Sequence, residues 1–130
     1  MFGDRKPLSN LEQFVLEAVW ERGSASADDV RETLAVRYPM KESTARTILH
    51  RLEQKGYVRH QVEGRFNKYR GVEKPADLAA NVVGGLISRF CGGSVEKLLI
   101  GMVDGNIIDE KELQQLANRI TALKKAEKSK

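Results

Sequence analysis

The spacing of apolar residues changes abruptly at Gly56, and this change restricts the possible folds more than any other feature of the chain. Before it, an apolar stripe at helical spacing predicts an amphipathic helix over residues 42–55. The stripe consists of Ala45, Ile48, Leu49 and Leu52. After it, β-branched and aromatic residues flank the turn signal Glu63-Gly64. This second pattern predicts a hairpin with strands at about 57–62 and 65–70.

Two more helices are predicted before this pair of elements. Ser9 and Glu12 have the spacing of a capping box, and the helical pattern that follows them ends at Gly23. The second helix starts after Ser26, a good N-cap, and is expected to run to Tyr38, because the proline that follows disfavours helical geometry there. Three helices followed by a hairpin are the winged helix-turn-helix arrangement.

After a joint near Pro75, three further helical patterns follow, which end at about residues 90, 102 and 123. The sequence therefore predicts a mainly α protein with a small β-hairpin: a winged-helix DNA-binding domain at 1–73 and a helical dimerisation domain at 74–130. Three helices in about fifty residues are too few to bury their own apolar faces, so a second copy is expected to cover them. The expected interface residues are Leu86, Phe90, Leu98, Leu99, Met102, Leu113, Leu116, Ile120 and Leu123.

Positive charge is concentrated over the predicted third helix and hairpin. Residues 41–70 carry eight Lys and Arg against three Glu, a local net charge of +5 in a chain whose total is +4. Such a concentration is typical of a surface that binds a polyanion.

The third helix is the expected recognition helix because its non-apolar side carries hydroxyls near its start and long donors further along. Arg can donate two hydrogen bonds to guanine, and threonine methyls can contact thymine methyls in the major groove. The wing is expected to lie on the DNA backbone or in the minor groove. The candidate DNA-binding residues are Lys41, Ser43, Thr44, Arg46, Thr47, His50 and Arg51 on the helix, and Arg65 and Lys68 on the wing.

Other functions find little support in the sequence. A winged helix that binds a protein in a signalling complex is the alternative interpretation. No catalytic motif is present, and neither His50, His60 nor the single Cys91 lies in a metal-ligand pattern, so we expect no enzyme activity, cofactor or metal. No apolar run approaches transmembrane length and no signal core is present, so we expect a cytoplasmic protein that does not insert into membranes.

These residues resemble the penicillinase repressor family over nearly the whole chain. The resemblance is strongest in the block Ser43 to Tyr57, and continues through Gly64-Arg65-Phe66, Leu86 to Phe90 and Asp109 to Leu113. It implies a homodimer on a palindromic operator, repression of nearby genes and a dimer made by the C-terminal helices. It also implies that Thr44, Arg46, Thr47 and Arg51 lie on the DNA-facing helix.

The sequence departs from two branches of that family. Copper-responsive members end in a cysteine-rich motif, whereas this chain has one cysteine and ends in Lys-Ala-Glu-Lys-Ser-Lys, which argues against copper sensing. Resistance-gene members are relieved by cleavage at an Asn-Phe pair, and the aligned pair here is Gly101-Met102, which argues against cleavage at that bond. A membrane sensor-protease partner is left open.

Overall fold

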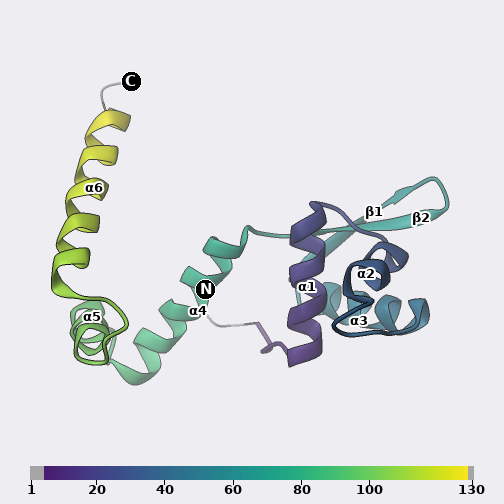
Figure 1. Cartoon of the computed structure of the whole chain (residues 1–130), viewed down its shortest axis with the longest axis horizontal. Helices are drawn as coiled ribbons and strands as arrows, with labels where there is room; N and C mark the ends of the chain where they lie inside the picture. The colour runs from purple at the N-terminus through teal and green to yellow at the C-terminus, as the bar shows by residue number, and fades with distance from the viewer. Residues whose placement is uncertain (1–4, 129–130) are drawn as a thin grey trace. The chain divides into compact units, whose positions relative to one another are not determined.

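The computed structural model describes residues 5–128, which form helices and one two-stranded antiparallel sheet (Figure 1). The elements are α1 (Asn10–Arg22), α2 (Ala27–Leu34), α3 (Glu42–Gln54), β1 (Val58–Glu63), β2 (Phe66–Gly71), α4 (Pro75–Phe90), α5 (Val95–Asp104) and α6 (Glu110–Lys128). The predicted mainly helical fold with a small hairpin is confirmed. The chain forms two compact units that divide between Gly84 and Gly85, inside α4. The division into a DNA-binding domain at 1–73 and a dimerisation domain at 74–130 stays a prediction.

The core of the first unit is built from the apolar stripes of α1, α2 and α3. The hairpin contributes Tyr57, Val58 and Tyr69, and the start of α4 contributes Leu78. The fully buried large side chains are Val15, Leu16, Val19, Val30, Leu49, Leu52 and Val58. All four residues of the α3 stripe are buried, so α3 is held against α1 and α2 by one face only.

Both N-terminal helices begin with a capping box. The Ser9 hydroxyl accepts from the Glu12 amide at 3.2 Å, and the Glu12 carboxylate accepts from the Ser9 amide at 2.8 Å. Glu12 also accepts from Lys55 Nζ at 2.7 Å, which ties α1 to the end of α3. Burial raises the pKa of Glu12, but the hydrogen bonds from Lys55 and Ser9 outweigh burial, and the pKa lies below its ordinary value.

The end of α2 differs from the prediction, because the helix stops at Leu34 and not at Tyr38. The Ala35 amide donates to the Glu32 carbonyl, three residues back, and the next residues form turns. The Tyr38 amide still donates to the Leu34 carbonyl at 2.7 Å, and Pro39 disfavours the helical conformation at Tyr38, so the chain forms a turn here and does not continue the helix. Val36, in this turn, is 95% exposed.

The hairpin lies one residue later than predicted. β1 pairs with β2 from Val58 opposite Gly71 to Glu63 opposite Phe66, so the two loop residues are Gly64 and Arg65. Gly64 has a φ of +62°, and glycine at the first loop position with positive φ suits a type II′ turn.

The junction that leads out of the hairpin is closed by Trp20. Its indole Nε1 donates to the Glu73 carbonyl at 3.1 Å. A Cβ on Gly71 would lie 2.5 Å from that nitrogen and 3.0 Å from the Glu73 carbonyl oxygen. Only glycine therefore allows α1 to pack against the end of β2. Trp20 is partly buried and packs against the core.

Lys68 anchors the hairpin to the start of α2. Its Nζ donates to the Asp29 carboxylate at 2.7 Å, and the same carboxylate accepts from the Ser26 amide at 2.9 Å. The hydrogen bond from Lys68, followed by that from the Ser26 backbone, outweighs burial and lowers the pKa of Asp29 from 3.8 to about 2.

The second unit exposes much apolar surface. Ser94 caps α5 by accepting from the Lys97 amide, and Asp109 accepts from the Glu112 amide at the start of α6. No residue of α5 or of the described α6 is buried. Of the expected interface residues, Leu98, Leu99, Met102 and Leu113 are half-buried, and Leu86, Phe90, Leu116, Ile120 and Leu123 are exposed.

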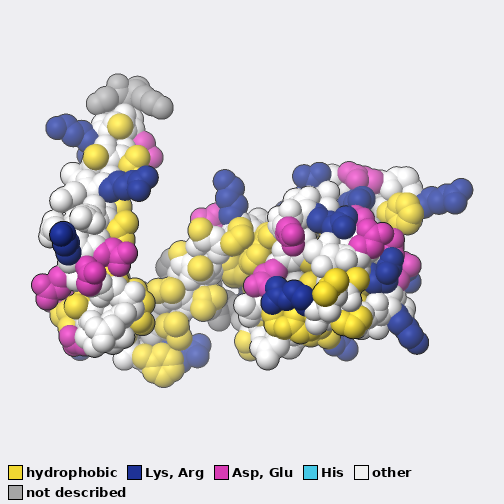
Figure 2. Space-filling model, in the orientation of Figure 1, with side chains coloured by type: hydrophobic (Ala, Val, Ile, Leu, Met, Phe, Trp, Pro, Cys, Tyr) yellow, Lys and Arg dark blue, Asp and Glu magenta, His cyan; other side chains and the backbone are white. Residues whose placement is uncertain are grey.

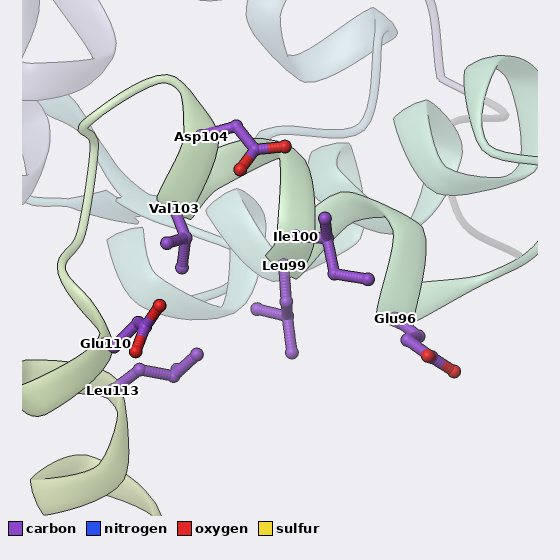
Figure 3. Close-up of a pocket in the computed structure, with 7 residues that line it drawn as sticks. All are labelled: Glu96, Leu99, Ile100, Val103, Asp104, Glu110 and Leu113. Atoms are coloured by element: carbon purple, nitrogen blue, oxygen red, sulfur yellow. The ribbon is translucent and has the colours of Figure 1, made fainter.

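A groove lies between α5 and α6 in this unit. It has a volume of about 500 Å³, and Figure 3 shows its apolar side chains between the two helices. It is lined by Glu96, Leu99, Ile100, Val103, Asp104, Glu110 and Leu113. The groove adds to the apolar surface that this unit leaves uncovered.

The junction yields a first prediction. Gly71→Ala forces Trp20 or the Glu73 backbone to move, so we expect the free energy of unfolding to fall by about 1–3 kcal/mol, as for other overpacked sites. Gly101→Ala is the matched control, because no atom lies within 4 Å of the added Cβ and alanine favours the helix by about 1 kcal/mol. Urea denaturation followed by circular dichroism measures both. Equal stability of the Gly71 variant and the wild type would contradict the prediction.

The Asp29–Lys68 ion pair yields a second prediction. A carboxyl whose pKa is lowered on folding stabilises the native state above its unfolded pKa, and this contribution disappears as the pH falls from about 3.8 to about 2. We expect Asp29→Asn to lower the free energy of unfolding by about 1–2 kcal/mol at pH 7. The difference between variant and wild type should narrow between pH 4 and pH 2. Denaturation at several pH values tests this, and a difference independent of pH would refute it.

Candidate nucleic-acid interface

Burial of the apolar stripe leaves one polar face of α3 in solvent. Exposed on it are Ser43, Thr44, Arg46, Thr47, His50 and Arg51, and Lys41 is exposed at the N-cap. The helix ends in a Schellman motif, in which Gly56 has a φ of +88° and Tyr57 donates to the Leu52 carbonyl at 2.9 Å. The helix and the strand that follows it are thus held in a fixed relation.

The start of α3 has amide groups that can bind an anion. Lys41 is the N-cap and gives no side-chain hydrogen bond to the helix, while its carbonyl accepts from Thr44 and Ala45. In the described part of the chain, the amides of Glu42 and Ser43 have no protein acceptor, and such amides bind phosphate oxygens well.

Two of the expected DNA-facing side chains form contacts with other residues of α3. The Thr47 hydroxyl donates to the Ser43 carbonyl at 3.0 Å, which leaves its methyl group for apolar contact with a base. Arg46 Nη2 forms an ion pair with Glu42 Oε1. This ion pair was not predicted from the sequence, although the spacing of four residues between Glu42 and Arg46 is the signal for such a pair.

The helix and the wing meet around one cleft. It has a volume of about 230 Å³ and brings Arg46 of α3 together with Arg65 at the wing tip. The remaining lining residues are Ser26, Ala27, Asp28, Glu42, Phe66, Asn67 and Tyr69. Phe66, which the sequence reasoning did not select, is 56% exposed, and Figure 2 shows basic and hydrophobic side chains together at the end of the hairpin.

The hairpin concentrates positive charge on one face. Arg59 lies directly opposite Arg70, and Gln61 lies opposite Lys68. Opposed like charges destabilise a strand pair, and within residues 5–128 neither arginine has an ion pair. A polyanion would remove this repulsion. Lys68 itself is already paired with Asp29, so contact with a phosphate would require it to exchange partners.

The two histidines have different surroundings. His60 Nδ1 lies 2.7 Å from the Glu53 carboxylate, and its amide donates to the same group at 3.0 Å, which joins β1 to the end of α3. His50 is exposed on α3. Over the described residues, no group of three or more His, Cys, Asp or Glu side chains could hold a metal ion.

No single described helix is long and apolar enough to cross a membrane. The successive helices α4 and α5 pass that test of length and composition only when they are taken together as a bent pair.

The chain is similar to several known proteins. The chain is 22% identical over 111 residues to the methicillin resistance regulatory protein MecI of Staphylococcus aureus, covering 85% of this chain and 90% of that protein. The solution structure of Bacillus licheniformis BlaI with the blaP half-operator is 27% identical, with a TM-score of 0.48, and the match covers 57% of this chain and 90% of that one. A RosR complex at 15% identity and a TM-score of 0.50, covering 78% and 90% of the two chains, shares the fold. The penicillinase repressor family model matches residues 8–122, and the chain therefore belongs to the penicillinase repressor family.

Proposed function

We propose that this protein is a homodimeric repressor that binds palindromic operator DNA, with α3 in the major groove. The observation that carries the proposal is the cleft in which the polar face of α3 meets the basic wing. A recognition helix reads base edges, and a wing contacts the backbone or the minor groove. Members of this family are repressors rather than enzymes, as the sequence predicted.

The proposed roles follow the chemistry of each side chain. Arg46 and Arg51 would donate to base edges, and Arg65 would enter the minor groove or contact its phosphates. Thr44 and Thr47 would contact thymine methyls, and Lys41, Ser43, His50 and Lys68 would contact phosphates or nearby base edges. The exposure of the helix residues and of Arg65 supports this assignment.

The proposed dimer rests on the uncovered apolar surface of the second unit. The exposed side chains of α4 and α6 include Leu86, Phe90, Leu116, Ile120 and Leu123. A second copy would remove this surface from water at about 25 cal/mol per Å². Two recognition helices joined in this way would suit the half-sites of a palindrome.

Protein binding by the winged helix is the alternative function. The opposed Arg59 and Arg70 favour a polyanion over a protein, because a mixed-charge protein surface would leave this repulsion in place.

We also propose that the protein acts in the cytoplasm and is released from DNA without cleavage at Gly101-Met102. In α5 the glycine offers a protease no side chain, and Met102 is half-buried. A membrane sensor-protease as partner is therefore a weaker proposal than DNA.

A salt titration of DNA binding tests the proposal. Phosphate contacts release counterions, so the logarithm of the association constant should fall with the logarithm of salt concentration with a slope steeper than about −4, at about −0.9 for each phosphate contacted. Joint replacement of Arg59 and Arg70 by Gln should make the slope shallower by about 1–2. Lys97→Gln with Lys111→Gln removes the same charge from the second unit and should change the slope little. Salt-independent, millimolar binding to every selected duplex would refute the proposal.

The dimer is tested in the full chain by placing charge on α6. Ile120→Asp with Leu123→Asp buries two carboxylates in the proposed interface, and we expect a monomer that binds operator DNA at least tenfold more weakly. Val36→Asp is the control, because this side chain is equally apolar and 95% exposed in the first unit. Sedimentation equilibrium and fluorescence anisotropy measure the two effects. A stable dimer of the α6 variant would place the interface elsewhere.

A further inference from the structure

Arg46 is held on the exposed face of α3 by an acidic neighbour. Its Nη2 pairs with Oε1 of Glu42, one helical turn earlier, and the two side chains are 62% and 47% exposed. An exposed pair at this spacing adds little to helix stability, because solvent screens both charges. An acid in the first turn also interacts favourably with the helix dipole, but that interaction does not require contact with Arg46.

The ion pair with Glu42 affects the contact of Arg46 with a guanine differently from its contact with a phosphate. A phosphate attracts any nearby positive charge, and a loose arginine can reach it from many directions. A guanine edge needs two N–H groups in a fixed orientation. The Glu42 contact occupies a single nitrogen of the guanidinium, so the other donors of its rigid fork remain for a bidentate contact. The carboxylate also offsets the charge that a phosphate would seek.

The other residues of the cleft leave Glu42 as the acidic partner of Arg46. Glu42 and Arg46 line the same cleft between α3 and the wing, together with Arg65 and Asp28. The Asp28 carboxylate is already paired with Arg31 at 2.8 Å, so Glu42 is the acid on this cleft that meets Arg46. Arg46 therefore has one acidic partner on this cleft, and that partner competes with phosphates for its guanidinium.

We propose that Glu42 is a positioning residue for sequence specificity: it orients Arg46 toward a guanine and withholds it from phosphates. This inference rests on the proposed binding of DNA by α3. Positioning of Arg46 by Glu42 would weaken binding to DNA in general and would raise the ratio between the affinities for operator and for random DNA.

The test compares wild type with Glu42→Ala on two duplexes, one selected from a random pool by the wild-type protein and one of random sequence. We expect the affinity of the variant for random DNA to rise about 3–10-fold and its salt slope on that DNA to steepen by about 0.9, the value of one added phosphate contact. The ratio of the two affinities should fall about tenfold, as for the loss of one bidentate base contact. Fluorescence anisotropy across a salt series gives all three quantities.

A double-mutant cycle with Arg46→Ala shows whether Glu42 acts through Arg46. In the Arg46→Ala background, removal of Glu42 should leave the affinity ratio unchanged, because no guanidinium remains to be positioned. Glu63→Ala is the matched control: it removes an exposed carboxylate from the wing and should raise both affinities by the same factor. Glu42→Gln keeps the shape without the charge, should also lower the ratio, and replaces Glu42→Ala if that variant melts early.

The outcomes separate this inference from the function on which it rests. A wild type that binds both duplexes equally overturns the proposed function and this inference together. A wild type that discriminates, with Glu42 variants that discriminate equally well, overturns this inference alone. The same result follows if loss of Glu42 lowers the ratio as much without Arg46 as with it, because Glu42 would then act directly.

Discussion

Burial of the single apolar stripe on α3 determines the rest of the first unit. Ala45, Ile48, Leu49 and Leu52 fill the core between α1 and α2, so the opposite side of the helix must face solvent. The ion pair from Lys55 to Glu12 fixes the end of the same helix against α1. The polar face is therefore presented by the packing of the core and needs no separate support.

The sequence predicted the elements that have a strong period or a local signal. The stripe of α3, the capping serines and the hairpin each depend on neighbouring residues, so their order was readable. The predicted end of α2 was four residues too late, and each predicted strand began and ended one residue too early. The end of α2 depends on the turn that the chain forms before Pro39, and the hairpin register depends on the positive φ of Gly64.

The exposed residues of the candidate site could be predicted from the sequence, but most of its ion pairs could not. Exposure of Arg46 and Arg51 followed from helical periodicity, whereas the contact of Lys68 with Asp29 joins residues 39 positions apart and has no sequence signal. Such contacts change what a count of charges means. Carboxylates already hold Arg46, Lys68 and His60, while Arg59 and Arg70 have no ion pair within residues 5–128. The positive charge that a polyanion meets is therefore mostly on the hairpin.

The tight contact at Gly71 has a consequence for how the function of each position is assigned. This glycine donates nothing to a ligand, yet its lack of a side chain lets Trp20 close the junction between the wing and α4. A genetic screen that scores only regulatory output would group Gly71 with the residues that read bases. Measuring protein abundance alongside output would separate the two classes, because a defect at the junction removes folded protein and a defect in recognition does not.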